Sequence, residues 1–161
     1  MNEIERKFLL TKLPKSLSPA PIQYERYFLK ITPSYEERVQ KKGDVYQREK
    51  KIVLSDTTRK TEKTTLSKQE FDTLKKTASK AIIRESYAFL EDTRITIKIY
   101  RGDYEGLSRA EVEFLSEEEA KQFAPLEWMG QEITHTALAR DARIIQLSKE
   151  EFQRLLNQYG S

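Results

Sequence analysis

Two glutamates and a lysine alternate with other residues at the start of the chain, as Glu3, Glu5 and Lys7. If residues 2–10 form a β-strand, these three side chains project from the same face, because successive side chains on a strand point to opposite faces. Magnesium ions in proteins bind carboxylate oxygens together with phosphate oxygens and water. The spacing therefore predicts a site that binds a divalent cation next to a phosphate group.

A second pair of glutamates, Glu111 and Glu113, has the same spacing in the segment 109–115, where apolar and charged residues alternate. Four carboxylates that face one another repel and raise one another's pKa values unless a cation joins them. The alternative is that both pairs face solvent, as most glutamates do. Two equally spaced pairs, each on a segment with an apolar opposite face, favour a shared metal site.

Basic residues are distributed over the other segments with strand character. Arginine binds phosphate oxygens through two hydrogen bonds at once, and lysine supplies a compact charge. If these side chains converge, they form a cage for an extended polyanion. The alternative is a set of solvated charges, which a chain with 34% charged residues provides by chance. The residues in question are Arg38, Lys51, Arg59, Arg84 and Lys98.

Most of the sequence has the character of β-strands separated by short polar turns. Three Ser-x-x-Glu capping boxes, which begin at Ser67, Ser116 and Ser148, predict helix starts. Short connections favour antiparallel neighbours. We therefore expect a mainly β fold, an eight-stranded antiparallel β-barrel with peripheral helices, formed as one domain by residues 1–161. The expected strands are residues 2–10, 23–31, 35–42, 45–54, 59–66, 81–90, 93–101 and 109–115.

The composition narrows the classes of function. The chain has 29 basic and 26 acidic residues and a net charge of +3, which is not the basic field of a general nucleic-acid-binding protein. Cysteine is absent and His135 is the single histidine, so thiolate zinc sites are excluded and a histidine-based metal site is disfavoured. No apolar run approaches 18 residues, and we expect no signal peptide because Met1 leads directly into a polar strand. We expect a cytoplasmic protein without membrane or specific nucleic-acid partners, and a homodimer stays open.

The N-terminal Glu-x-Glu-x-Lys motif, followed by Phe8, Leu9 and Leu10, resembles the opening of the CYTH superfamily, also called triphosphate tunnel metalloenzymes. The Glu-Val-Glu-Phe sequence at residues 111–114 strengthens the likeness. Weaker matches, which extend it over nearly the whole chain, are residues 35–38, Lys51 and residues 130–134.

The resemblance implies an eight-stranded antiparallel barrel that forms a tunnel open at both ends. Its lumen would bind a small-molecule triphosphate or polyphosphate with Mg²⁺ or Mn²⁺. Carried over by position, the resemblance assigns metal binding to Glu3, Glu5, Glu111 and Glu113. It assigns the binding of phosphate oxygens to Lys7, Arg38, Lys51 and Arg84.

Several positions depart from the family pattern, and Lys98 stands where the family usually has an acidic residue. The changes remove carboxylates and arginines from the expected lumen. They could reduce two metal ions to one, with Lys98 compensating part of the glutamate charge. The departing positions are Gln40, Thr61, Lys63, Ser86 and Lys98, followed by Ala139 and Asp141 near the end of the chain.

Two functions follow from these residues. The preferred one is a triphosphatase, a metal-dependent phosphohydrolase that cleaves a linear triphosphate, most simply inorganic tripolyphosphate. The alternative is a polyphosphate- or nucleotide-binding module whose catalysis is weakened or lost. Glu49 and Glu85 are the candidates for a general base, although neither stands out. Cyclase activity is disfavoured because nothing in the sequence identifies a base-recognition pocket.

Overall fold

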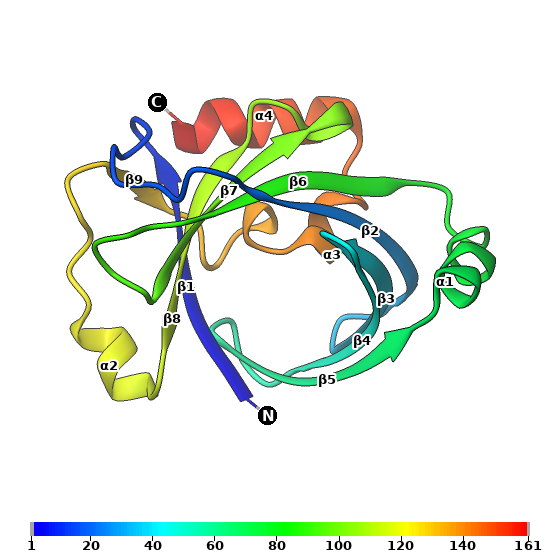
Figure 1. The fold of residues 1–161 in the computed structure, drawn as a ribbon. Helices are drawn as coiled ribbons and strands as arrows, with labels where there is room; N and C mark the ends of the chain where they lie inside the picture. The colour runs from blue at the N-terminus through cyan, green and yellow to red at the C-terminus, as the bar shows by residue number, and fades with distance from the viewer. Residues whose placement is uncertain (1, 161) are drawn as a thin grey trace.

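The computed structural model describes residues 2–160. Its strands are β1 (Asn2–Leu10), β2 (Ile22–Ile31), β3 (Tyr35–Lys42), β4 (Val45–Val53), β5 (Thr58–Leu66), β6 (Ala81–Ala88), β7 (Ile95–Arg101), β8 (Ser108–Phe114) and β9 (Met129–Glu132). They form one antiparallel sheet in the order β5-β4-β3-β2-β6-β7-β8-β1-β9. A short pairing between β5 and β1 closes the sheet into a barrel, with β9 outside the closure (Figure 1). The predicted fold class is confirmed.

The ninth strand is the part of the sheet that the sequence did not reveal. It has four residues, Met-Gly-Gln-Glu, in which apolar and polar side chains do not alternate clearly. It pairs with the end of β1, where Met129 lies opposite Leu10. Gly130 permits this close approach, since a Cβ atom there would lie 3.1 Å from the carbonyl oxygen of Leu9.

The predicted capping boxes each start a helix. These helices are α1 (Lys68–Lys75), α2 (Glu117–Gln122) and α4 (Lys149–Gly160). At Ser67 and Ser148 the box is complete, because the serine and the glutamate three residues later each accept a backbone hydrogen bond from the other residue. Sequence reasoning missed the short helices η1 (Gly102–Tyr104), η2 (Ala137–Ala139) and α3 (Asp141–Ile144). None of the helices within residues 2–160 is both long and apolar enough to cross a membrane.

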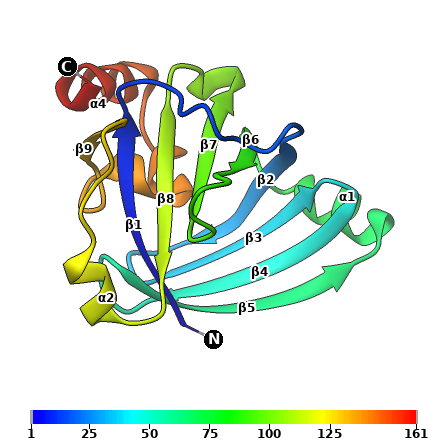
Figure 2. The ribbon, with the colours of Figure 1, turned by 60° about the vertical axis from the view of Figure 1, so that its left-hand side comes forward.

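Much of the apolar core lies on the outer face of the barrel, because apolar and polar side chains alternate along the strands. Strands β1 and β8 run side by side (Figure 2). Phe8 of β1 and Val112 of β8 point outward and are buried in the same apolar cluster. On another wall, α1 places the ring of Phe71 5.9 Å from that of Tyr27 and 5.0 Å from that of Tyr46. The inward strand faces around the cavity carry mostly charged residues.

A second apolar cluster fills one end of the barrel. Phe28, Ile82 and Tyr100, which share the inward strand face with charged residues, pack there with Leu138 of η2 and Ile144 of α3. In Figure 1, α3 lies within the outline of the barrel. The second open end expected from the family resemblance is therefore not found, because apolar side chains occupy it.

Candidate active site

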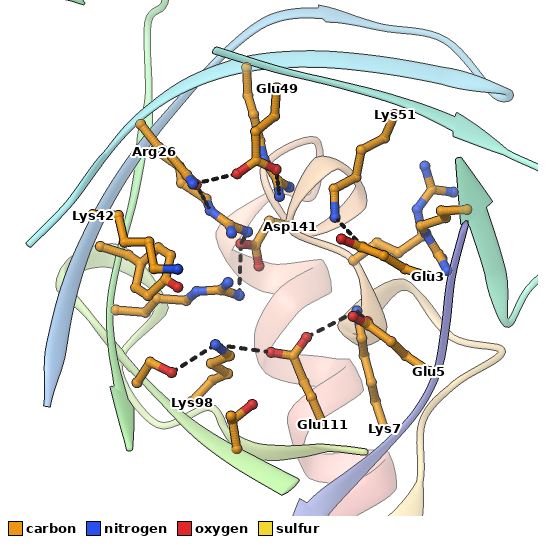
Figure 3. Close-up of a pocket in the computed structure, with 18 of the residues that line it drawn as sticks. Glu3, Glu5, Lys7, Arg26, Lys42, Glu49, Lys51, Lys98, Glu111 and Asp141 are labelled. Atoms are coloured by element: carbon orange, nitrogen blue, oxygen red, sulfur yellow. Dashed lines mark hydrogen bonds and ion pairs between the residues drawn. The ribbon is translucent and has the colours of Figure 1, made fainter. Parts of the chain in front are cut away.

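The interior of the barrel contains a cavity of about 280 Å³ that is lined mostly by charged side chains (Figure 3). Eleven basic and seven acidic residues contribute to the lining. The cavity brings together the predicted site residues Glu3, Glu5, Lys7, Arg38, Glu49, Lys51, Arg59, Arg84, Glu111 and Glu113. Of the departing positions, Gln40, Lys63, Ser86, Lys98 and Asp141 line it as well. The lining does not include Thr61, Glu85 or Ala139.

Glu85, one of the two candidates for a general base, lies outside the cavity. It follows Arg84 on β6, and neighbouring residues on a strand point to opposite faces. Arg84 lines the cavity, whereas the carboxylate of Glu85 accepts hydrogen bonds from Gln23 and Arg101 on the outer surface. The structure therefore does not support Glu85 as a general base.

Glu49, the other candidate, lines the cavity but is held by neighbouring side chains. Arg38 donates to one of its carboxylate oxygens at 2.8 Å, and Gln40 donates to the other. Burial alone would raise the pKa of Glu49, but Arg38 and Arg26 outweigh burial and hold that pKa far below its usual range. A carboxylate with so low a pKa is a weak proton acceptor, so Glu49 is poorly suited to be a general base.

Three carboxylates, those of Glu3, Glu5 and Glu113, form a group that we call the acidic rim. Glu5 lies directly opposite Glu113 across β1 and β8. Burial and the neighbouring carboxylates, that of Glu5 foremost, raise the pKa of Glu113. Lys51 pairs with Glu3 at 2.9 Å and Lys7 with Glu5 at 3.4 Å, whereas no ion pair joins Glu113 to a basic side chain within residues 2–160. The rim therefore carries negative charge that the described side chains do not balance.

Two lysines lie on either side of Glu111. The Nζ atoms of Lys7 and Lys98 are 3.5 and 3.6 Å from its two carboxylate oxygens (Figure 3). Lys7 also donates to the carbonyl oxygen of Ala139 at 2.7 Å, and Lys98 donates to Ser86 Oγ at 2.8 Å. Burial lowers the pKa of Lys7 to about 8 and that of Lys98 to about 7. Burial would raise the pKa of Glu111, but Lys98 and Lys7 outweigh it and hold that pKa well below its usual range.

Asp141, at the start of α3, binds three arginines in a group that we call the arginine–aspartate cluster. Its carboxylate oxygens lie 2.8 Å from Arg26, 3.0 Å from Arg84 and 3.4 Å from Arg109, and Tyr100 donates to it as well. Its side chain is 1% exposed. Burial would raise the pKa of Asp141, but Arg84, Arg109 and Arg26 hold it far below its usual range. The negative charge of Asp141 is therefore more than compensated within the chain, because the cluster has three guanidinium groups for one carboxylate.

Sequence reasoning missed several residues of the lining. Arg109 precedes Glu111 by two positions, and Glu36 precedes Arg38 by two, so the period of a strand could have placed both in the cavity. Arg140 lies between η2 and α3 and pairs with Glu36 at 3.2 Å, and no strand period predicts its place. The missed lining residues are Ile22, Tyr24, Arg26, Glu36, Lys42, Thr96, Arg109 and Arg140.

The carboxylates of the site have the donor chemistry for a hard divalent cation such as Mg²⁺ or Mn²⁺. The rim has unbalanced negative charge, and Oε2 of Glu111 is buried without a hydrogen bond. Within residues 2–160, no three acidic or histidine side chains are already grouped closely enough to hold a metal ion. The residues thus fit the ion in chemistry, and their side chains would have to turn toward it.

Comparison with known proteins identifies relatives of the chain, although no family model matches it. The inorganic triphosphatase of Nitrosomonas europaea is 30% identical over 138 residues, which are 83% of this chain and 90% of that protein. A crystal structure of the inorganic triphosphatase NE1496 has a TM-score of 0.67 and 25% identity, over 91% of this chain and 95% of that one. A crystal structure of the hypothetical protein NE1496 has a TM-score of 0.66 and 26% identity, over 88% and 96%. The chain therefore belongs to the CYTH superfamily, the triphosphate tunnel metalloenzymes.

Proposed function

We propose that this protein is a metal-dependent phosphohydrolase that cleaves a linear triphosphate, with inorganic tripolyphosphate as the simplest substrate. The observation that carries the proposal is one cavity in which the carboxylate of Glu113, without an ion pair among the described residues, lies beside an excess of cations. A linear triphosphate is a polyanion, and eleven basic against seven acidic side chains suit it. The relative named inorganic triphosphatase supports the same class of reaction.

The acidic rim would hold the metal ion, with Glu111 beside it. A bound Mg²⁺ or Mn²⁺ supplies positive charge and orientation for phosphate oxygens, which phosphoryl transfer requires. The raised pKa of Glu113 supports this assignment, because burial and the neighbouring carboxylates both disfavour its charged form when no cation is bound. Basic side chains of the protein itself would bind the phosphate groups.

Lys7, Lys51 and Arg59 would bind the phosphate oxygens nearest the rim. Lys51 and Lys7 pair with rim carboxylates at 2.9 and 3.4 Å, so carboxylates that turn toward a metal ion would release both ammonium groups. Arg59 lies opposite Glu3 across the seam between β1 and β5, and it donates to the carbonyl oxygen of Asp56 at 3.3 Å. The triphosphate and the metal ion would thus bind cooperatively.

Positioning, rather than proton abstraction by a side chain, would provide most of the catalysis. Glu49 is held ionised by Arg38, and Glu85 lies outside the cavity. Phosphoryl transfer depends largely on alignment and on stabilisation of charge, so a site without a strong general base can still be active. The filled end of the barrel would leave the substrate one side from which to enter.

One observation favours the second candidate, a module that binds polyphosphate or a nucleotide without hydrolysis. Arg38 is 2.8 Å from Glu49, and Arg84 is 3.0 Å from Asp141. Two arginines expected to bind phosphate are thus already paired with carboxylates of the chain. Removal of a single preorganised donor can slow a reaction by about 10²–10³-fold.

Phosphate release from tripolyphosphate, ATP and thiamine triphosphate, each with Mg²⁺ and with Mn²⁺, distinguishes the two functions. We expect release from tripolyphosphate that requires the metal ion. The double variant Glu3→Gln with Glu5→Gln should lose at least about 10²-fold of that release. The matched control is Glu62→Gln with Glu91→Gln, two exposed glutamates outside the cavity lining, which should leave release unchanged.

Two results would contradict the proposal. If tripolyphosphate raises the midpoint of thermal unfolding but no phosphate is released with either metal, the protein is a binding module. If the double variant releases phosphate at the rate of the wild type, the metal assignment is wrong.

A further inference from the structure

Glu111 differs from the three rim glutamates because two ammonium groups already hold it. Lys7 Nζ lies 3.5 Å from one carboxylate oxygen and Lys98 Nζ 3.6 Å from the other. Glu111 is buried, as both lysines are. Its charge is therefore balanced from within the chain, while that of Glu113 is not.

The walls of the barrel fix the ammonium group of Lys98 in place. Lys98 is 7% exposed, and it donates at 2.8 Å to the hydroxyl of Ser86, its cross-strand neighbour. Its Nζ also lies 5.0 Å from the ring centre of Tyr24, a distance at which the aromatic face attracts a cation. A mobile surface lysine could swing away from an arriving metal ion, but this one is held from three sides.

The position of Lys98 bears on how many metal ions the site can take. Two-metal phosphohydrolases place two cations about 3.5–4 Å apart, each on carboxylate oxygens. A second ion would need Glu111 Oε2, the buried oxygen without a hydrogen bond, which is the atom that Lys98 faces. That ion would lie against the ammonium groups of Lys98 and Lys7, and like charges at such separations repel strongly in a partly buried site.

We propose that Lys98 takes the place of a second divalent cation, so that the site binds one metal ion, on the acidic rim. The inference rests on the proposed function and sharpens it. The rim receives the one ion, and Lys98 serves as the counter-charge of Glu111, a role that Lys7 shares until substrate binds. Lys98 is in this sense a positioning residue of the site.

The test is a titration of the metal-free protein of residues 1–161 with Mn²⁺, monitored by calorimetry and by electron paramagnetic resonance. The wild type should bind one equivalent and give the spectrum of an isolated ion. Lys98→Glu adds a carboxylate next to Glu111 and removes the competing charge, so it should bind a second equivalent whose signal is broadened by spin coupling. Lys98→Met removes the charge without adding a ligand and should stay at one equivalent.

Lys63→Glu is the matched control. Lys63 also lines the cavity, on β5, but it forms no ion pair with the site glutamates among the described residues. A new carboxylate there should leave the stoichiometry at one. If Lys98→Glu does not fold, the number of Mn²⁺ ions that the wild type binds still tests the inference.

Two equivalents, or none, in the wild type would overturn the inference, as would a folded Lys98→Glu that stays at one. Because the titration contains no substrate, the outcome is independent of hydrolysis. A protein that binds one Mn²⁺ and releases no phosphate contradicts only the proposed activity. A protein that hydrolyses tripolyphosphate and binds two contradicts only the role of Lys98.

Discussion

The acidic rim and the arginine–aspartate cluster occupy the same barrel, but basic side chains compensate the charge of Asp141 and leave that of Glu113 without an ion pair among the described residues. Glu113 of the rim is an exposed residue, but partial burial of its carboxylate and the neighbouring carboxylates raise its pKa. Asp141 of the cluster is buried among Arg26, Arg84 and Arg109, which lower its pKa. A charge that the chain balances itself supports the fold, whereas a charge left unbalanced is typical of a functional site that a ligand completes. Residue type alone does not distinguish a structural carboxylate from one that belongs to a functional site.

The largest effect on stability is expected from a substitution in the arginine–aspartate cluster. Asp141→Asn removes the charge that three buried guanidinium groups share, and removal of one partner from a buried ion pair typically costs about 3–5 kcal/mol. The free energy of unfolding, measured with urea, should fall by that amount. Asp103→Asn, at an exposed aspartate of η1, is the control and should change it little. A loss no larger than that of the control would mean that Asp141 is not a structural charge.

Lowering the pH should reduce the stabilisation that Asp141 gives to the folded protein, without a mutation. The folded state lowers the pKa of Asp141 below the unfolded value of about 3.9, so its stabilisation is present above that pH and is lost as the pH falls. The difference in unfolding free energy between the wild type and Asp141→Asn should be constant near neutral pH and shrink below about pH 5. Urea unfolding of both proteins at each pH measures it. A difference that persists unchanged to about pH 3 would contradict an ionised Asp141.

The smallest effect, with the opposite sign, is expected at the rim. Glu113→Gln removes a charge that repels its neighbours, so the metal-free protein should become more stable. Solvent screens this exposed carboxylate, and the gain should be at most about 0.5 kcal/mol. The affinity for Mn²⁺ should fall by about tenfold or more in calorimetry, as for other groups that support a metal site. A variant that is less stable than the wild type would show that Glu113 has a structural partner.

The fold could be predicted largely because the strands alternate. Ile95 and Ile97 on β7 share a face that packs into the core, and Thr96 and Lys98 share the face that lines the cavity. A period of two fixes both faces at once. The strand β9 escaped prediction because its four residues are too few to show a period.

The site could be predicted where its residues follow that period and not where they depend on closure of the barrel. Glu3 and Glu5 belong to one strand, so their spacing alone places them together. Arg84 and Glu85 are adjacent on β6, so the same alternation would have placed Glu85 outside the cavity once Arg84 was placed inside it. The contact between Arg26 and Asp141 joins residues 115 positions apart, and no local pattern indicates it.

An anomalous difference map from a crystal grown with Mn²⁺ and tripolyphosphate tests most directly whether the acidic rim is the metal site. Manganese scatters anomalously, so its position can be located independently of the phosphate density. We expect one strong peak among the carboxylates of Glu3, Glu5 and Glu113, with phosphate density between it and the cations of the cavity. A peak elsewhere in the barrel, or none at the rim while phosphate is bound, would contradict the assignment.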